Sequence, residues 1–205
     1  MEPSLHSALL SLLGEQGIRT AEADLLSYSY DNSRLSVTPE AVLFPHSEEQ
    51  IREIICLCKT HNTPITTRGR GSGTAGAAVP VSGGVVLSTE KMRKIVRIES
   101  ENRLMVVEPG VSNQEVQQAA AKHGFFWAPD PGSAPFCSVG GNISCGTAGP
   151  RAVKYGTVRE NVLGLKAVTG DGELIRTGTE TTKWAIGYDL TQLLTGSEGT
   201  LAIIT

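Results

Sequence analysis

Features that would point to a large or charged partner are scarce in this sequence. Basic residues show no surplus, because 18 Lys and Arg stand against 21 Asp and Glu and leave a net charge of −3. Binding to a nucleic-acid backbone depends on such a surplus, so a nucleic-acid partner is excluded. No apolar run approaches the ~20 residues of a membrane span, and the first residues lack the basic stretch of a secretory signal. We expect a cytoplasmic chain without a membrane span, peripheral to a membrane only through partners.

Metal-binding and catalytic patterns are equally scarce. Cysteine gives one C-x-C pair and no C-x-x-C motif, which argues against a zinc or redox site. We interpret the four thiols as buried; they are Cys56, Cys58, Cys137 and Cys145. We interpret the histidines as surface or helix-end residues; they are His6, His46, His61 and His123. Without paired carboxylates or metal-ligand spacing, the sequence predicts no metal site and leaves the catalytic residues unknown.

Glycine is the residue type in clear excess. It occupies 23 of 205 positions, about 11% against a usual ~7%. A chain of this length forms one domain, or one domain plus an arm. The glycines are densest at 69–84, which we call the glycine loop, and a second irregular stretch covers 128–156. Irregular segments this long inside a compact domain are typical of ordered ligand loops.

Hydrophobic periodicity predicts alternating helices and strands in the first half of the chain. Leucines at helical spacing predict a helix over 4–16 with Ser4 as its cap. Ser47 to Gln50 has the form of a capping box that opens a second helix. Short strands are expected at 41–44, 64–67 and 85–87.

The second half is predicted to be richer in hairpins. Apolar runs at 95–98 and 104–107 predict one hairpin, and runs at 162–169 and 173–177 predict another across Gly170-Asp-Gly172. Helices are expected at 111–124 and 189–194. The chain stops within an apolar, β-prone run at 201–205, so we expect that something is missing downstream.

The glycine loop matches a dinucleotide fingerprint in letters but not in context. Gly71 to Gly76 reads G-x-G-x-x-G after a strand, yet Pro80 and two further glycines leave no room for the helix of a Rossmann site. A Walker loop is excluded because no Gly-Lys-Ser/Thr occurs. Successive small residues at 69–74 instead favour a nest of backbone N–H groups that binds diphosphate, with Ser72 and Thr74 as further donors. The alternative is a mobile turn.

Five blocks, in this order along the chain, carry a resemblance to a known family. They are Arg68 to Gly76 with Pro80, Pro129 to Ser133 with Ser138 to Ser144, Tyr155 to Leu165, Gly187 to Leu190, and Gly196 to Thr205. Over residues 38–205 the chain resembles the FAD-binding domain shared by vanillyl-alcohol oxidase, FAD-linked D-lactate dehydrogenases and the glycolate oxidase flavin subunit. This resemblance implies an α+β fold of the PCMH type, with a small βαβ-like lobe (38–90) and a lobe with a larger mixed or antiparallel sheet and flanking helices (91–205). Residues 1–37 would be a helical arm.

The resemblance also implies the cofactor and its contacts. The diphosphate of FAD would lie against the backbone of 69–74, with Ser133, Asn142 and Ser144 bonding the ribityl or phosphate region, and Tyr155 and Ile203 near the flavin. The implied site residues are Arg68, Gly69, Arg70, Gly71, Ser72, Gly73, Thr74, Gly76, Pro80, Pro109, Gly110, Asp130, Pro131, Ser133, Gly140, Gly141, Asn142, Ser144, Gly149, Tyr155, Glu198, Gly199 and Ile203.

Three positions depart from the family pattern. Ser72 stands where members with attached flavin carry histidine, so we expect non-covalent FAD. Arg70 replaces a small residue and either crowds the phosphates or adds a charge partner for them. Ala202 replaces a common glycine.

The activity implied by the resemblance is oxidation of a small 2-hydroxy acid of the glycolate or D-lactate type, with hydride passing to FAD. The substrate would be held by a C-terminal domain absent from this chain or by a partner chain, and an electron-transfer subunit is a further implied partner. The alternatives are a stand-alone flavin-binding module or truncated fragment without catalysis of its own, and a domain that has lost its flavin and binds only a partner.

Overall fold

The computed structural model describes residues 1–183 and 185–205. Its first lobe is built on a four-stranded sheet in the order β1-β2-β4-β3. The strands are β1 (Ile18–Arg19), β2 (Ala41–Leu43), β3 (Ile65–Arg68) and β4 (Val85–Ser88). β4 pairs in parallel with both β2 and β3, whereas β1 is antiparallel to β2. The three expected strands and the βαβ-like connection are confirmed.

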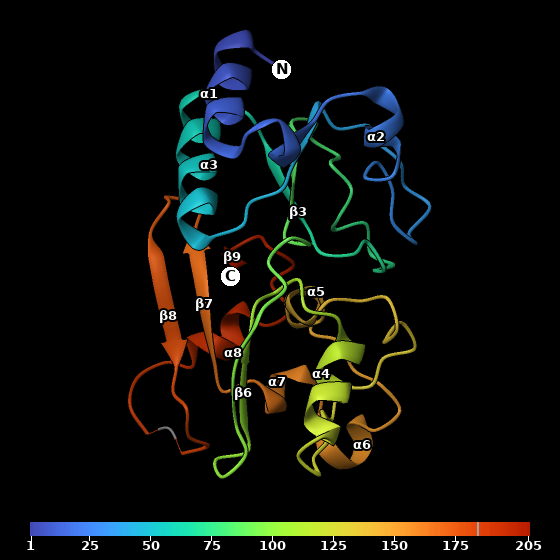
Figure 1. The fold of residues 1–205 in the computed structure, drawn as a ribbon, viewed down its shortest axis with the longest axis vertical. Helices are drawn as coiled ribbons and strands as arrows, with labels where there is room; N and C mark the ends of the chain where they lie inside the picture. The colour runs from blue at the N-terminus through green and yellow to red at the C-terminus, as the bar shows by residue number, and fades with distance from the viewer. Residues whose placement is uncertain (184) are drawn as a thin grey trace.

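Helices α1 (Pro3–Leu13) and α3 (Glu48–Thr60) lie side by side against this sheet (Figure 1). Leu5 and Leu9 of α1 are fully buried in the same core as Ile51 and Ile54 of α3. Residues 1–37 thus supply α1, the 3-10 turn η1 (Glu15–Gly17), β1 and α2 (Glu22–Leu26) to the first lobe. The segment expected as an arm packs as part of the lobe, because its leucines contribute to the core.

The predicted helix caps need two corrections. Ser4 lies inside α1, which begins at Pro3, and its hydroxyl donates to a carboxylate oxygen of Glu2. Ser47 does cap α3 by accepting from the backbone N–H of Gln50. The second half of the expected capping box is displaced, because the Gln50 side chain accepts from the N–H of His46 instead.

The second lobe contains both predicted hairpins. β5 (Ile95–Glu99) pairs antiparallel with β6 (Leu104–Val107), and β7 (Gly164–Thr169) pairs antiparallel with β8 (Leu174–Gly178). β9 (Ala202–Ile204) adds to β7 and gives a three-stranded sheet in the order β8-β7-β9. The larger sheet expected for this lobe is therefore divided into two small antiparallel sheets. The expected helices are present as α4 (Asn113–Ala121) and α8 (Leu190–Leu194).

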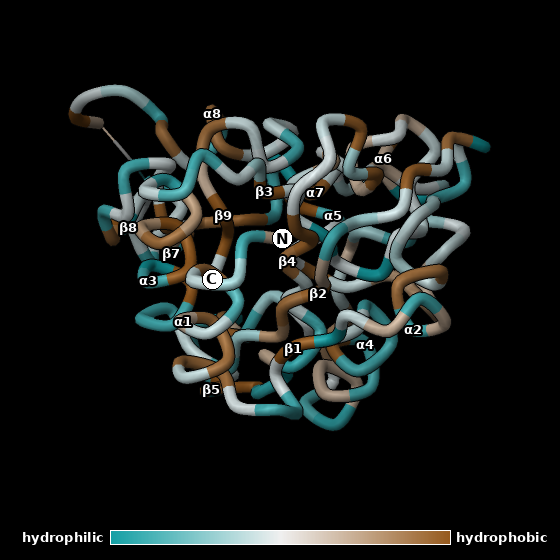
Figure 2. The backbone as a smooth tube through the Cα atoms, turned by 90° about the horizontal axis from the view of Figure 1, so that it is seen from above, coloured by the Kyte–Doolittle hydropathy of each residue, from teal (hydrophilic) through white to brown (hydrophobic). Residues whose placement is uncertain are grey.

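Strands β7 and β9 contribute side chains to two hydrophobic cores, one on each face of their sheet. Val168 and Ile203 belong to the core of the first lobe, whereas Ala167 and Ile204 belong to that of the second. Neighbouring residues of a strand point to opposite faces, so this alternation joins the lobes through one sheet. Seen from above, the residues of β2, β4, β7 and β9 form a largely hydrophobic interior (Figure 2).

The stretch 128–156, predicted to be irregular, contains two short helices. These are α5 (Val139–Ser144) and α6 (Ala152–Tyr155), and a further short helix, α7 (Val158–Asn161), precedes β7. The hydroxyl of Ser138 caps α5, and Thr157 with Glu160 forms a complete capping box on α7. Sequence periodicity did not reveal these helices because they have only six, four and four residues, and the side-chain caps of α5 and α7 rather than periodicity define their starts. Across the described residues, no helix has the length and apolar character to cross a membrane.

Candidate active site

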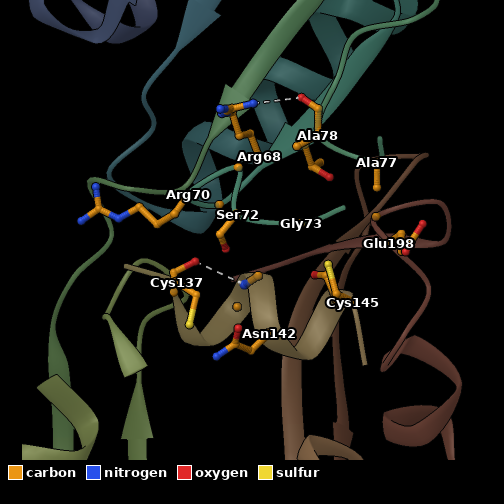
Figure 3. Close-up of a pocket in the computed structure, with 18 of the residues that line it drawn as sticks. Arg68, Arg70, Ser72, Gly73, Ala77, Ala78, Cys137, Asn142, Cys145 and Glu198 are labelled. Atoms are coloured by element: carbon orange, nitrogen blue, oxygen red, sulfur yellow. Dashed lines mark hydrogen bonds between the residues drawn. The ribbon is translucent and has the colours of Figure 1, made fainter. Parts of the chain in front are cut away.

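A cavity of about 340 Å³ opens between the two lobes. Its walls are the end of β3 with the glycine loop, helix α5, and the C-terminal stretch around β9, as the close-up in Figure 3 shows. Predicted residues that line it are Arg68, Gly69, Arg70, Gly71, Ser72, Gly73, Thr74, Pro109, Ser133, Gly140, Gly141, Asn142, Ser144, Glu198, Gly199 and Ile203. Blocks far apart in the sequence therefore meet around one space.

The glycine loop presents unpaired backbone donors. Among the hydrogen bonds between described residues, none uses the backbone N–H of any residue from 69 to 76 as donor. Gly71 has a φ of +64°, a left-handed conformation that glycine adopts without strain. Gly73 has no heavy atom within 4 Å of an added Cβ, so this part of the loop is open. A run of free N–H groups without side-chain bulk is suited to an anionic group with several oxygens.

The side chain of Arg68 anchors this loop through hydrogen bonds to backbone carbonyls. Its guanidinium donates to the carbonyl oxygens of Tyr30 (2.8 Å), Ser27 (3.2 Å) and Ala78 (3.3 Å). The Arg68 side chain is buried, its guanidinium carbon lies 5.5 Å from the ring centroid of Tyr28, and burial lowers the pKa of the guanidinium. The hydrogen bonds of Arg68 thus go to backbone carbonyls, and the Asp31 carboxylate is close enough to act on the charge and oppose the lowering of its pKa.

The side chain of Arg70, unlike that of Arg68, is not buried. Its side chain is exposed and extends away from the other labelled residues of the cavity (Figure 3). In this arrangement Arg70 does not crowd the space beside Gly71 and Ser72.

Helix α5 forms the opposite wall through close packing. An added Cβ on Gly140 would lie 2.4 Å from the Cβ of Pro109, and one on Gly69 would lie 2.7 Å from the Ser138 hydroxyl. Asn142 is buried, and its amide nitrogen donates to Oδ1 of Asn113 at 3.2 Å. One N–H of the Asn142 amide is thereby used, and the other N–H and the amide oxygen remain for a ligand.

Comparison with known proteins explains this arrangement. Residues 39–178 match the FAD binding domain family. The chain belongs to this family. It is 39% identical over 198 residues to the glycolate oxidase subunit GlcD of Bacillus subtilis, covering 96% of this chain and 42% of that protein. It is 41% identical over 184 residues to a D-lactate dehydrogenase of Archaeoglobus fulgidus, covering 87% of this chain and 41% of that protein. The chain thus spans about two fifths of these relatives.

Solved structures confirm the PCMH-type fold of this FAD-binding domain. An alkyldihydroxyacetonephosphate synthase superposes with a TM-score of 0.87 at 22% identity, covering all of this chain and 42% of that one. A substrate-bound p-cresol methylhydroxylase superposes with a TM-score of 0.79 at 23% identity, covering all of this chain and 43% of that one. The predicted family, fold class and FAD cofactor are confirmed.

The cavity of this FAD-binding domain has the chemistry that FAD requires. The free N–H groups at 69–75 suit the diphosphate, and short polar side chains such as Ser133 and Ser144 suit sugar and ribityl hydroxyls. Apolar contact is available from Ala202 and Ile203. The hydrogen-bonding groups of the described residues that line the cavity therefore fit FAD, the cofactor in the family's name.

Seven predicted site residues do not line the cavity; they are Gly76, Pro80, Gly110, Asp130, Pro131, Gly149 and Tyr155. The structure gives several of them packing contacts instead. An added Cβ on Gly149 would lie 2.3 Å from the carbonyl oxygen of Asp130, whose carboxylate pairs with Arg151 at 3.2 Å. Tyr155 packs edge to face on Phe126 with ring centroids 5.1 Å apart.

Sequence reasoning did not select twelve of the lining residues, which are Asp31, Thr67, Ala75, Ala77, Ala78, Thr89, Cys137, Ser138, Cys145, Thr147, Ala202 and Ile204. Ser138 was detectable as a cap before α5, and Ala202 and Ile204 by their position beside Ile203. No local pattern marks Asp31, which lies in the segment between α2 and β2, outside the family match.

The cysteines also need a correction. Cys58 and Cys137 are buried as predicted, whereas Cys56 and Cys145 are exposed. Desolvation, with the Glu198 and Asp31 carboxylates nearby, raises the pKa of the Cys145 thiol at the edge of the cavity. The thiol is therefore kept protonated and weakly nucleophilic. None of the four histidines lines the cavity formed by the described residues.

Proposed function

We propose that this chain is the FAD-binding part of a flavin-dependent 2-hydroxy-acid dehydrogenase or oxidase of the glycolate or D-lactate type. The observation that carries the proposal is the combination of a cavity fitted to FAD with relatives, named as glycolate oxidase subunit and D-lactate dehydrogenase, at 39% and 41% identity. Bound FAD would supply a hydride acceptor for the carbinol carbon of the acid.

The residues of this chain bind and orient the cofactor in that scheme. The glycine loop holds the diphosphate, and α5 and β9 limit the space in which the rest of the cofactor lies. No lining residue is assigned as the base that takes the substrate proton. We propose that a further domain or a partner chain holds the hydroxy acid and supplies that base, and that an electron-transfer partner reoxidises the flavin.

We also propose that FAD is held without a covalent bond. Ser72 offers a hydroxyl where histidine would be needed, and the Cys145 thiol is kept protonated by its surroundings. Acid precipitation of the purified, FAD-loaded chain tests this directly. Yellow colour in the supernatant is the expected result, whereas colour retained in the pellet would overturn non-covalent binding.

The activity is tested on the full-length product of the gene that encodes this chain. Under anaerobic conditions, glycolate or D-lactate should bleach the long-wavelength flavin band, and an unrelated primary alcohol should not. A yellow protein that neither acid bleaches would reject the 2-hydroxy-acid proposal while leaving FAD binding intact.

The alternative is a flavin-binding module without catalysis of its own. It is favoured by the cavity itself, where the described lining residues include no histidine and the buried Arg68 is committed to carbonyls. The same bleaching assay separates the two, because a module would bind FAD fully and leave it oxidised with every hydroxy acid.

A further inference from the structure

Arg159 of helix α7 binds the end of helix α8, just before the chain enters the C-terminal wall of the cavity. Its guanidinium donates to the carbonyl oxygens of Gln192 at 2.6 Å and of Thr195 at 2.8 Å. Gln192 lies in α8 and Thr195 is the C-cap of that helix. The last carbonyls of a helix lack intrahelical donors, and an arginine side chain can supply them.

The Arg159 guanidinium takes the place of a backbone donor. In a continuing helix the N–H of Gly196 would donate to the carbonyl of Gln192, four residues earlier. In the structure this N–H donates instead to the carbonyl of Ile143 in α5, at 2.9 Å. The chain can therefore leave α8 and cross to the end of α5, because Arg159 bonds the carbonyl that Gly196 gives up.

The turn that follows, 196–199, is part of the cavity wall. Glu198 and Gly199 line the cavity, and the N–H of Glu198 donates to the carbonyl of Ser144 at 2.8 Å. An added Cβ on Gly199 would lie 2.2 Å from Oγ1 of Thr67, which belongs to β3 and also lines the cavity. The position of this turn therefore decides how the C-terminal wall meets the strand that leads into the glycine loop.

The backbone of this turn is unusual. The φ angles are +86° at Gly196, +53° at Glu198 and +78° at Gly199. Glycine adopts such left-handed conformations freely, but glutamate does so rarely because of its Cβ. A residue held in such a conformation depends on the structure around it, and Arg159 bonds the residue directly before the turn.

We propose that Arg159 is a positioning residue of the FAD site, which holds the turn 196–199 in the place that the bound cofactor requires. The role parallels that of Arg68, whose guanidinium bonds backbone carbonyls around the glycine loop. Each lobe thus fixes its part of the cavity wall through one arginine bonded to carbonyls. The inference rests on FAD as the cofactor and is independent of the hydroxy acid.

The test measures FAD affinity of the apoprotein for Arg159→Met and Arg159→Lys. Methionine removes every donor, and the loss of charge-assisted bonds predicts FAD binding that is roughly tenfold or more weaker. Lysine keeps the charge with fewer donors, and binding roughly threefold weaker is expected. The matched control is Arg176→Met, which removes an exposed arginine of β8 paired with Glu180 and should change affinity by less than about twofold. Parental FAD affinity of Arg159→Met would overturn the proposal.

Two further readouts separate positioning from a general loss of stability. The melting temperature is recorded without and with FAD, because a merely structural role lowers the first value and leaves the gain on adding FAD unchanged. Visible circular dichroism of the saturated protein reports the surroundings of the bound flavin. We expect a smaller gain and an altered spectrum for Arg159→Met, with most of the parental spectrum restored in Arg159→Lys. A parental gain and spectrum in Arg159→Met would overturn the proposal.

The design also covers a variant that does not fold. If Arg159→Met is not obtained as a folded protein, Arg159→Lys is tested alone, and parental FAD affinity of that variant would overturn the proposal. Failure of the cofactor assignment looks different, because the parent itself would then bind no FAD. None of these readouts depends on hydroxy-acid oxidation.

Discussion

The cavity has two glycine-bearing walls that use glycine for opposite purposes. In the glycine loop, Gly73 faces open space and the N–H groups of 69–76 have no partner among the described residues. In α5, an added Cβ on Gly140 would collide with Pro109, and Asn142 is tied into a buried amide network. In the glycine loop, glycine allows a ligand to approach the backbone. In α5, glycine allows the helix backbone to pack closely against Pro109.

The two walls also differ in how they are held. Helix α5 is held by its own cap and by contact with the turn at Pro109. Among the described hydrogen bonds, residues 69–75 of the glycine loop make none with one another, and they depend on the buried Arg68 and on the segment 27–32. A binding surface made of unpaired backbone groups must take its rigidity from side chains behind it. Four predictions test this contrast.

The largest effect is expected from removing the anchor of the loop. Arg68→Met should lower the free energy of unfolding of the apoprotein by about 3 kcal/mol, because it leaves buried carbonyls of Ser27, Tyr30 and Ala78 without donors. Urea unfolding measures the loss. Arg70→Met is the control, since Arg70 is exposed, and it should unfold like the parent. Equal stability of both variants would show that the loop does not need its anchor.

The helical wall should respond to crowding. Gly140→Ala places a Cβ 2.4 Å from the Pro109 side chain and 3.0 Å from its carbonyl oxygen, so the unfolding free energy should fall by about 2 kcal/mol. The neighbouring Gly141→Ala is the control, because its Cβ meets only the Ser138 hydroxyl at 3.1 Å and the Gly69 Cα at 3.9 Å. Thermal unfolding of the apoproteins should separate the two variants. A Gly140→Ala protein as stable as Gly141→Ala would contradict the packing role.

FAD binding by the loop should respond more strongly to an added charge than to added size. Gly73→Asp should weaken FAD binding by roughly tenfold or more without changing apoprotein stability, because the new carboxylate repels the diphosphate in a place with free space. Gly73→Ala is the control, because it adds bulk without charge, and it should weaken FAD binding less than Gly73→Asp does. Gly71 is less suitable, since its left-handed φ and the nearby Arg68 guanidinium make any substitution disruptive. Parental affinity of Gly73→Asp in equilibrium titration would remove the diphosphate from this loop.

The smallest effect concerns Tyr28, which packs against Arg68. Burial and the Glu90 carboxylate raise the pKa of Tyr28 to about 12 from an ordinary 10.0. Between these values the unfolded chain has lost the phenolic proton that the folded chain keeps, so stability from this group falls as the pH rises from 10 to 12. Tyr28→Phe should cost about 1 kcal/mol near neutral pH through the lost bond to Glu90, and its deficit should shrink in alkali. Parallel alkaline stability curves for both proteins would refute the assignment.

Much of the fold could be predicted because it is decided locally. The two hairpins follow from alternating apolar runs around polar turns, and α3 follows from the spacing of Ile51, Ile54 and Ile55 after a serine cap. The short helices α5, α6 and α7 were not predicted, because helices of six, four and four residues leave no clear periodic signal. The division of the second lobe into two sheets also depends on pairing between distant strands.

The sequence by itself determined that the glycine loop is not a Rossmann site, since Pro80 and the paired glycines forbid the required helix. The five sequence blocks, in their order along the chain, indicated the FAD-binding family. Only the tertiary structure decided which residues line the cavity. It bound the Arg68 guanidinium to backbone carbonyls, engaged the amide nitrogen of Asn142, and brought Asp31 to the glycine loop. The direction of a side chain depends on which partners the folded chain places around it, and those partners are distant in the sequence.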